Sequence, residues 1–287
     1  METTELLKRV RRIEIKTKGL SRQIFAGEYH SAFKGRGMSF SEVRNYQYGD
    51  DVRNIDWNVT ARSGEPFVKV FEEERELTVM LLVDISKSSF FGSQKQLKNE
   101  LITEICAVLA FSATNNNDKV GLLLFSDRVE KFLPPKKGRG HILRIIRELL
   151  DTKPEGSGTD IGAALTYFTN MVKKRSICFL LSDFLATDYS RPLRLATRRH
   201  DLIGMHLVDP REEELPAVGL LRARDAETGA VDWIDTDSKR VRRQYAAWYE
   251  EQQTYFQDAF KKSGADTLRV TTTEDYTRAL LRFFKNR

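Results

Sequence analysis

The sequence is poor in cysteine, and it has no long hydrophobic run. Its two cysteines, Cys106 and Cys178, are too few for a disulfide scaffold or a multi-cysteine zinc site, and their apolar surroundings indicate buried thiols in a reducing compartment. The longest mainly apolar run, residues 77–83, is far shorter than the roughly 20 residues that cross a bilayer. Residues 1–12 are charged and have no apolar signal-peptide core. We therefore expect a cytoplasmic protein without a membrane span.

The chain also has little net charge for its size. Lysine and arginine number 47 and aspartate and glutamate 41, which gives +6 over 287 residues. Basic clusters such as residues 239–243 have no interleaved aromatic motif, so we expect solvated faces and no nucleic-acid binding. Hydrophobic residues make up 40% of the chain and charged residues 31%, as in a globular protein with a sizeable core.

Residues 1–76 are expected to form an N-terminal helix and an arm or subdomain that does not fold alone. Glycines within residues 25–40 predict hairpins or loops, and Asp50 or Asp51 is expected to cap a short helix through residues 56–57. Residues 66–71 alternate in polarity and predict a strand. The N-terminal helix is predicted from helical spacing of Leu6, Leu7, Val10 and Ile13.

Residues 77–287 alternate between short apolar runs and amphipathic segments. Strands are predicted at 77–83, 120–125, 128–133, 176–181, 202–208 and 267–270, with a hairpin within 219–234. Helices are predicted at 94–114, 140–150, 161–172, 192–197, 238–262 and 275–284. This alternation predicts an α/β domain with a doubly wound, mostly parallel sheet, and such sheets bind ligands at the carboxyl ends of their strands.

Three polar segments are expected at that carboxyl edge. The turn Asp84-Ile85-Ser86-Lys87-Ser88 follows the first strand, Thr159 lies in the glycine-rich loop 156–160, and Asp183 follows the strand at 176–181. Carboxylate and hydroxyl oxygens suit Mg²⁺, which accepts few protein ligands and keeps some water. The three segments together therefore predict a cation site.

Each segment also has a simpler interpretation. Asp84 could belong to an ordinary polar turn, and Thr159 or Asp160 could cap the helix that begins at residue 161. Asp183 could cap the helix that follows it. Their order along the chain favours the cation site.

The pattern Asp-x-Ser-x-Ser, then a threonine after a glycine-rich loop, then an aspartate after a later strand resembles the von Willebrand factor A domain, and the likeness covers roughly the last three quarters of the chain. The resemblance implies a Rossmann-type fold and a metal-ion-dependent adhesion site. It also implies that Mg²⁺, or else Mn²⁺ or Ca²⁺, is bound by the side chains of Asp84, Ser86, Ser88, Thr159 and Asp183.

The N-terminal segment narrows the resemblance. Residues 35–46, residues 48–57 and the following Thr60-Ala61-Arg62 are similar to the signature of the bacterial domain of unknown function 58 family, whose members join it to a von Willebrand A-like domain. Some members carry transmembrane helices ahead of this signature, and this sequence departs from them there. The resemblance implies that the protein works with a partner, a MoxR-type AAA+ ATPase, and it gives less indication of a chemical reaction.

We therefore expect a non-enzymatic adaptor whose bound cation attracts an acidic side chain of a partner protein. The alternative is a metal-assisted hydrolase at the same sheet edge, although the sequence has no Asp-x-Asp pair, no Gly-x-Ser-x-Gly elbow and no P-loop. A nucleic-acid-binding protein is the third hypothesis, and it rests only on the modest positive charge.

Charged residues of the arm could form a partner surface, but we expect an intrachain network of caps and ion pairs that fixes the arm to the sheet domain, with Trp57 anchored in the core. The residues concerned are Asp50, Asp51, Arg53, Asp56 and Arg62.

Overall fold

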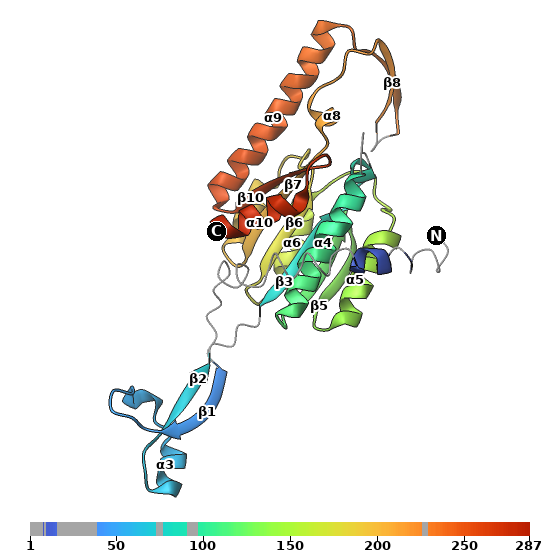
Figure 1. Cartoon of the computed structure of the whole chain (residues 1–287). Helices are drawn as coiled ribbons and strands as arrows, with labels where there is room; N and C mark the ends of the chain where they lie inside the picture. Colours follow the sequence, from blue (N-terminus) through green and yellow to red (C-terminus); the bar gives the residue numbers. More distant parts are fainter. Residues whose placement is uncertain (1–7, 9, 16–38, 73–76, 91–96, 226–228) are drawn as a thin grey trace. The chain divides into compact units, whose positions relative to one another are not determined.

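The computed structural model describes residues 8, 10–15, 39–72, 77–90, 97–225 and 229–287 (Figure 1). The chain divides into two compact units, an arm unit (Phe33–Glu76) and a sheet unit (Met1–Ala32 with Leu77–Arg287). Residues 10–15 are helical and Val10 is buried, as expected, whereas Leu6, Leu7, residues 25–38 and the start of the family signature lie outside the described residues. The predicted division into residues 1–76 and 77–287 therefore stays a prediction.

The arm unit is a two-stranded antiparallel sheet with two short helices. Strand β1 (Ser39–Asn45) pairs with β2 (Phe67–Glu72), and the 3-10 helix η1 (Val52–Asn54) and helix α3 (Trp57–Ser63) lie between them in the chain. Caps and ion pairs connect several of these charged residues within the arm unit, and their predicted role in fixing the arm to the sheet domain stays a prediction. Asp51 caps η1, Asp56 caps α3, and Arg44 donates two hydrogen bonds, of 2.8 and 2.7 Å, to the Asp50 carboxylate.

The expectation for Trp57 is wrong. Its side chain is 69% exposed at the start of α3. The physical reason is the small size of the arm unit: among residues 42–69, whose burial is described, Val68 is the one buried hydrophobic side chain, too little to enclose an indole ring.

The sheet unit contains a six-stranded sheet in the order β10-β7-β6-β3-β4-β5, with only β5 antiparallel to its neighbour. The strands are β3 (Thr78–Asp84), β4 (Lys119–Phe125), β5 (Val129–Lys136), β6 (Ile177–Ser182), β7 (Asp201–Val208) and β10 (Asp266–Thr271). This is the expected doubly wound, mostly parallel sheet. The direction of winding switches between β3 and β6. Strands β4 and β5 extend the sheet on one side of β3, whereas β6, β7 and β10 extend it on the other side.

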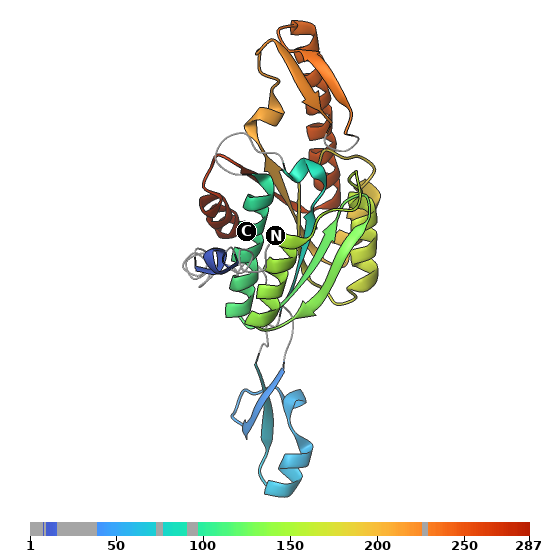
Figure 2. The ribbon, with the colours of Figure 1, turned by 90° about the vertical axis from the view of Figure 1, so that its right-hand side faces the viewer.

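Helices cover both faces of this sheet (Figures 1 and 2). Residues 79–83 of β3 are fully buried, as their continuous apolar run predicts. One face packs against α6 (Ile161–Met171), α7 (Ser190–Thr197) and the second half of α9 (Lys239–Ser263). The other carries α4 (Lys98–Asn115), α5 (Arg139–Asp151) and α10 (Tyr276–Asn286).

The connection between β7 and β10 is long and projects from the sheet (Figure 1). It contains α8 (Pro210–Glu213), the predicted hairpin of β8 (Leu220–Arg224) and β9 (Val231–Asp235), and α9. The expected cap at Asp51 is confirmed at the start of η1, although this helix ends before residues 56–57. Strand β1, α8 and the 3-10 helix η2 (Lys87–Phe90) were not predicted, since short elements carry little periodicity. Among the described residues, no helix combines the length and the hydropathy that a membrane crossing requires.

Close packing of α9 on the sheet depends on Gly204 in β7. A Cβ atom at this position would lie 2.3 Å from Cε1 of Phe260, a fully buried ring of α9. Both Gly204 and Phe260 lie in the interior, so neither can shift without disturbing its neighbours.

We predict that Gly204→Ala lowers the free energy of unfolding by about 1–3 kcal/mol, because the added methyl group overpacks the core. The matched control is Gly140→Ala in α5, where an added Cβ meets nothing within 4 Å. Urea unfolding followed by circular dichroism measures both, and equal stabilities for the two variants would contradict the packing described.

Candidate functional site

The switch point of the sheet brings two of the predicted ligands to adjacent strand ends. Strand β3 ends at Asp84 and its parallel neighbour β6 ends at Ser182, one residue before Asp183. Both strands run in the same direction, so the two aspartates leave the sheet at the same edge. Both are buried, Asp84 fully and Asp183 with 7% of its surface exposed.

The turn at residues 84–88 folds around the Asp84 carboxylate. Oδ1 accepts a 2.9 Å hydrogen bond from the backbone N–H of Ser86, and the Ser86 and Ser88 hydroxyl oxygens lie 3.0 Å apart. Ser182 donates a 2.7 Å hydrogen bond to Asp84 Oδ2. Lys87 is exposed, so its charge does not enter the buried group. The turn is thus also the polar turn of the simpler interpretation, and the two roles are compatible.

Asp183 belongs to the same group because it directly follows Ser182, which hydrogen-bonds Asp84, and because its carboxylate interacts electrostatically with Asp84 and Ser88. Asp84, Ser86, Ser88 and Asp183 are therefore linked by hydrogen bonds and electrostatic proximity into one cluster, called the rim cluster below. Asp183 does not cap the next helix, because α7 begins only at Ser190 after an N-cap at Tyr189.

The loop with Thr159 lies at the same edge, beside the end of β4. Ser126 and Asp127 follow β4 directly. The backbone carbonyl of Ser126 accepts a 2.8 Å hydrogen bond from the Asp160 N–H, and Asp127 Oδ2 accepts a 3.3 Å hydrogen bond from the Ser157 N–H. β4 neighbours β3, and its last residue is in register with Asp84. Thr159 is half-buried there, and Asp160 is the N-cap of α6, with its side chain accepting from the Ala163 N–H. Metal binding by Thr159 and the rim cluster stays a prediction.

The two rim carboxylates differ in their electrostatic surroundings. Burial, together with the nearby charge of Asp183, raises the pKa of Asp84 to about 6. Burial acts in the same direction on Asp183, but the ammonium of Lys98 outweighs it, with help from Ser88, and the pKa of Asp183 is lowered. Burial lowers the pKa of the neighbouring His206 to about 4, so this side chain is neutral at pH 7.

Lys98, the first residue of α4, is a site residue that the sequence analysis missed. Its side chain is only 1% exposed, and Nζ lies 3.0 Å from Asp183 Oδ2 and 2.6 Å from Glu212 Oε1 of α8. Burial lowers the pKa of Lys98, but the two carboxylates more than offset this and the pKa is raised. The available signal was a lysine in the first turn of a helix, where the macrodipole disfavours a cation.

The backbone beside Asp183 is held in an unusual conformation. Phe184 has φ = 53°, the left-handed region that a bulky residue rarely adopts, and its ring is fully buried against Phe256 and Phe260 of α9. Packing of this ring offsets a backbone strain of about 1–2 kcal/mol. The core thus fixes the direction in which Asp183 leaves β6.

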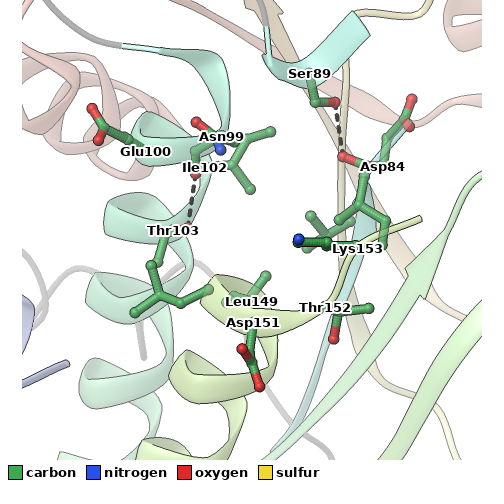
Figure 3. Close-up of a pocket in the computed structure, with 13 residues that line it drawn as sticks. Asp84, Ser89, Asn99, Glu100, Ile102, Thr103, Leu149, Asp151, Thr152 and Lys153 are labelled. Atoms are coloured by element: carbon green, nitrogen blue, oxygen red, sulfur yellow. Dashed lines mark hydrogen bonds between the residues drawn. The ribbon is translucent and has the colours of Figure 1, made fainter. Parts of the chain in front are cut away.

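A cavity of about 230 Å³ lies next to Asp84, between the first turns of α4 and the end of α5 (Figure 3). Ile85, Ile102 and Leu149 are among its apolar lining residues, and Asn99 lines it from α4. At its edge, Ser89 donates a 3.0 Å hydrogen bond to the backbone carbonyl of Asp84. The rim cluster is therefore bordered by a largely apolar hollow rather than by close packing.

The donor set suits a hard divalent cation. Asp84 is a fully buried carboxylate that accepts hydrogen bonds from the Ser86 backbone N–H and the Ser182 hydroxyl, and it is repelled by Asp183. A divalent cation between the two carboxylates would remove this repulsion, and the adjacent Ser86 and Ser88 hydroxyls are further oxygen ligands of the kind that Mg²⁺ prefers. Among the described residues there is no group of three or more His, Cys, Asp or Glu side chains placed to hold a metal, so any ion here depends on hydroxyl ligands.

Sequence comparisons match this chain to one family model and to other proteins. A family model described as "Protein of unknown function DUF58" matches residues 42–255. The uncharacterized protein Rv1480 of Mycobacterium tuberculosis is 29% identical over 290 residues, covering all of this chain and 91% of its own length.

Among solved structures, the conserved hypothetical protein BatB from Bacteroides thetaiotaomicron has a TM-score of 0.49 at 16% identity, over 73% of this chain and 98% of its own. Proximal thread matrix protein 1 from the mussel byssus, with a zinc-occupied MIDAS motif, has a TM-score of 0.38 at 18% identity, over 46% of this chain and 38% of its own. At these scores neither match supports an argument about function.

We predict that Asp84→Asn stabilises the metal-free protein at pH 7.5, because a buried charge next to Asp183 is removed while the side-chain size and the acceptor for the Ser86 N–H are kept, and the new NH2 group can donate to the Ser182 oxygen. A shift of the Asp84 pKa to about 6 corresponds to a gain of about 1–3 kcal/mol. Thermal melting in EDTA is the measurement.

Asp160→Asn is the matched control, because asparagine is as good an N-cap as aspartate and little change is expected. A lower melting temperature for Asp84→Asn than for the wild type would show that the Asp84 charge is needed for folding, contrary to this account.

Proposed function

This chain belongs to the DUF58 family of proteins of unknown function, and we propose that it is a non-enzymatic adaptor that binds an acidic side chain of a partner protein through a divalent cation. The observation that carries the proposal is the rim cluster, in which two buried carboxylates from neighbouring strands converge with the hydroxyls of Ser86 and Ser88. Mg²⁺ is the proposed ion, with Mn²⁺ or Ca²⁺ as substitutes.

The chemistry of the cluster favours binding over catalysis. When bound, the cation supplies an electrophilic position that an incoming carboxylate can occupy. The residues of the chain hold and orient this position: Ser86 and Ser88 would be neutral ligands that add no negative charge to the cation, and Ser182 fixes the Asp84 carboxylate by a hydrogen bond. A charge-assisted contact next to a partly dry surface can act as a hot spot in an interface.

We further propose that the partner is, or is assembled by, a MoxR-type AAA+ ATPase, which would use this protein in the assembly or activation of other complexes. The support for this part is the resemblance of the signature in residues 35–62. A cytoplasmic location belongs to the same proposal, and it is supported by Cys106 and Cys178, which are free and buried thiols.

The alternative is a metal-assisted hydrolase at the same edge. Such an enzyme needs a general base or a second metal beside the first ion. His206, which neighbours the cluster, is neutral but enclosed by Phe184 and Phe256, a setting typical of a core histidine. Turnover of phosphate or ester substrates that is abolished by Asp183→Ala would favour the hydrolase.

We predict that Mg²⁺ or Mn²⁺ raises the melting temperature of the wild type and leaves that of Ser86→Ala/Ser88→Ala unchanged, because the variant lacks both hydroxyl ligands. Ser157→Ala, which removes an exposed hydroxyl from the glycine-rich loop, is the control and should keep the shift. Equal shifts in all three proteins would place the ion elsewhere.

We also predict that the wild type, in the presence of Mg²⁺, captures a partner protein that is lost with EDTA and with Ser86→Ala/Ser88→Ala. A pulldown followed by mass spectrometry identifies the partner and tests for an AAA+ ATPase. A partner retained equally by the variant would mean that binding does not use the cation.

A further inference from the structure

We propose that Lys98 is a built-in competitor of the divalent cation: its ammonium group shares the Asp183 carboxylate with the ion and keeps the affinity of the rim for metal low. This inference rests on the proposed metal site, and it assigns a role to a residue that the family resemblance did not include. It follows from the position of one buried charge.

The geometry places the ammonium at the metal's own ligand. Nζ of Lys98 lies 3.0 Å from Asp183 Oδ2, and the lysine is 1% exposed, so water does not screen the contact. A cation bound by Asp84 and Asp183 would be repelled by this fixed positive charge across a single carboxylate.

Glu212 makes the arrangement tolerable in the absence of metal. Its Oε1 lies 2.6 Å from Lys98 Nζ, and it belongs to α8, whose N-cap Asp209 is fully buried and accepts a 2.8 Å hydrogen bond from Thr272. The pair Lys98–Glu212 is neutral as a unit. Its positive end is the one that contacts Asp183, so the ion would meet the positive end of the pair.

The charge count explains why such a competitor is compatible with metal binding. Asp84, Asp183 and Glu212 carry three negative charges and Lys98 one positive charge, which leaves two negative charges for a divalent cation to neutralise. Without Lys98 the same ion would sit in a net negative site that repels an incoming carboxylate. The lysine thus weakens metal binding, but the site with its cation bound has no net charge and does not repel the carboxylate of an acidic partner.

The position of Lys98 supports a role other than helix stability. It is the first residue of α4, whose N-cap Leu97 offers no side-chain hydrogen bond. The helix macrodipole disfavours a cation there, and burying a lysine is costly unless it is paired. A neutral residue at this position would suit the helix better.

The experiment measures the dissociation constant for Mn²⁺ by calorimetry in the wild type and in variants of these residues. We expect Lys98→Met to bind Mn²⁺ at least about tenfold more tightly than the wild type and Glu212→Gln to bind it several-fold more weakly, since each changes the local charge by one unit. The affinity of the double variant Lys98→Met/Glu212→Gln for Mn²⁺ should lie between those of Lys98→Met and the wild type. The double variant loses one positive and one negative charge, and the positive charge is the one nearer to Asp183.

Lys87→Met is the matched control. It removes the same charge from the exposed lysine inside the Asp84–Ser88 turn, where solvent screens it, so the affinity should change by no more than about threefold. Circular dichroism in EDTA shows which variants fold. If Lys98→Met leaves two buried carboxylates unpaired and does not fold, the charge-balanced double variant decides the matter.

The outcomes separate this inference from the proposed function. Weaker or unchanged Mn²⁺ binding by Lys98→Met, or by the double variant if the single one does not fold, overturns the competitor role and instead indicates that Lys98 positions Asp183 or has no effect. If Asp84→Ala also abolishes binding, the metal site itself stands. If neither the wild type nor the Lys98 variants bind Mn²⁺ at millimolar concentrations, the metal site and the competitor role are both wrong.

Discussion

The organising constraint of this structure is the burial of two carboxylates, Asp84 and Asp183, at neighbouring strand ends. Like charges in a site of low dielectric constant repel strongly, and each must be stabilised by hydrogen bonds or by a cation. The chain supplies the backbone N–H of Ser86 and the hydroxyl of Ser182 to Asp84, and the ammonium of Lys98 to Asp183. The ammonium offsets only part of the negative charge of Asp84, Asp183 and Glu212, and the metal site, the partner chemistry and the role of Lys98 all follow from the net negative charge that remains.

The hydrophobic core fixes the distance between these two carboxylates. Strands β3 and β6 pair in parallel over fully buried residues, which sets Asp84 and Asp183 at adjacent ends. On one face, Gly204 lets the ring of Phe260 approach the sheet, and the same group of aromatic side chains holds Phe184 in its left-handed conformation. Close packing far from the edge therefore determines the geometry of the polar cluster, since packed interiors transmit small displacements.

Much of the fold could be predicted because a strand buried on both faces leaves a continuous apolar run, as in residues 79–83, and because the aspartates follow two such runs. Lys98 and Glu212 could not, since they are 114 residues apart and polar side chains carry no sign of burial in the sequence. Trp57 shows the opposite failure: an indole suggests a core, but the arm unit is too small to provide one. The burial of Lys98 and Glu212 and the exposure of Trp57 all depend on tertiary contacts, which the local sequence pattern does not contain.

The most direct test of the central claim is a crystal structure of the protein grown with Mn²⁺, with anomalous diffraction used to locate the ion. The account predicts a single strong peak at the carboxyl edge of the sheet, in coordinating distance of Ser86 Oγ and Ser88 Oγ and next to the Asp84 carboxylate. A map with no peak there, or with the Mn²⁺ bound only at other surface carboxylates, would contradict it.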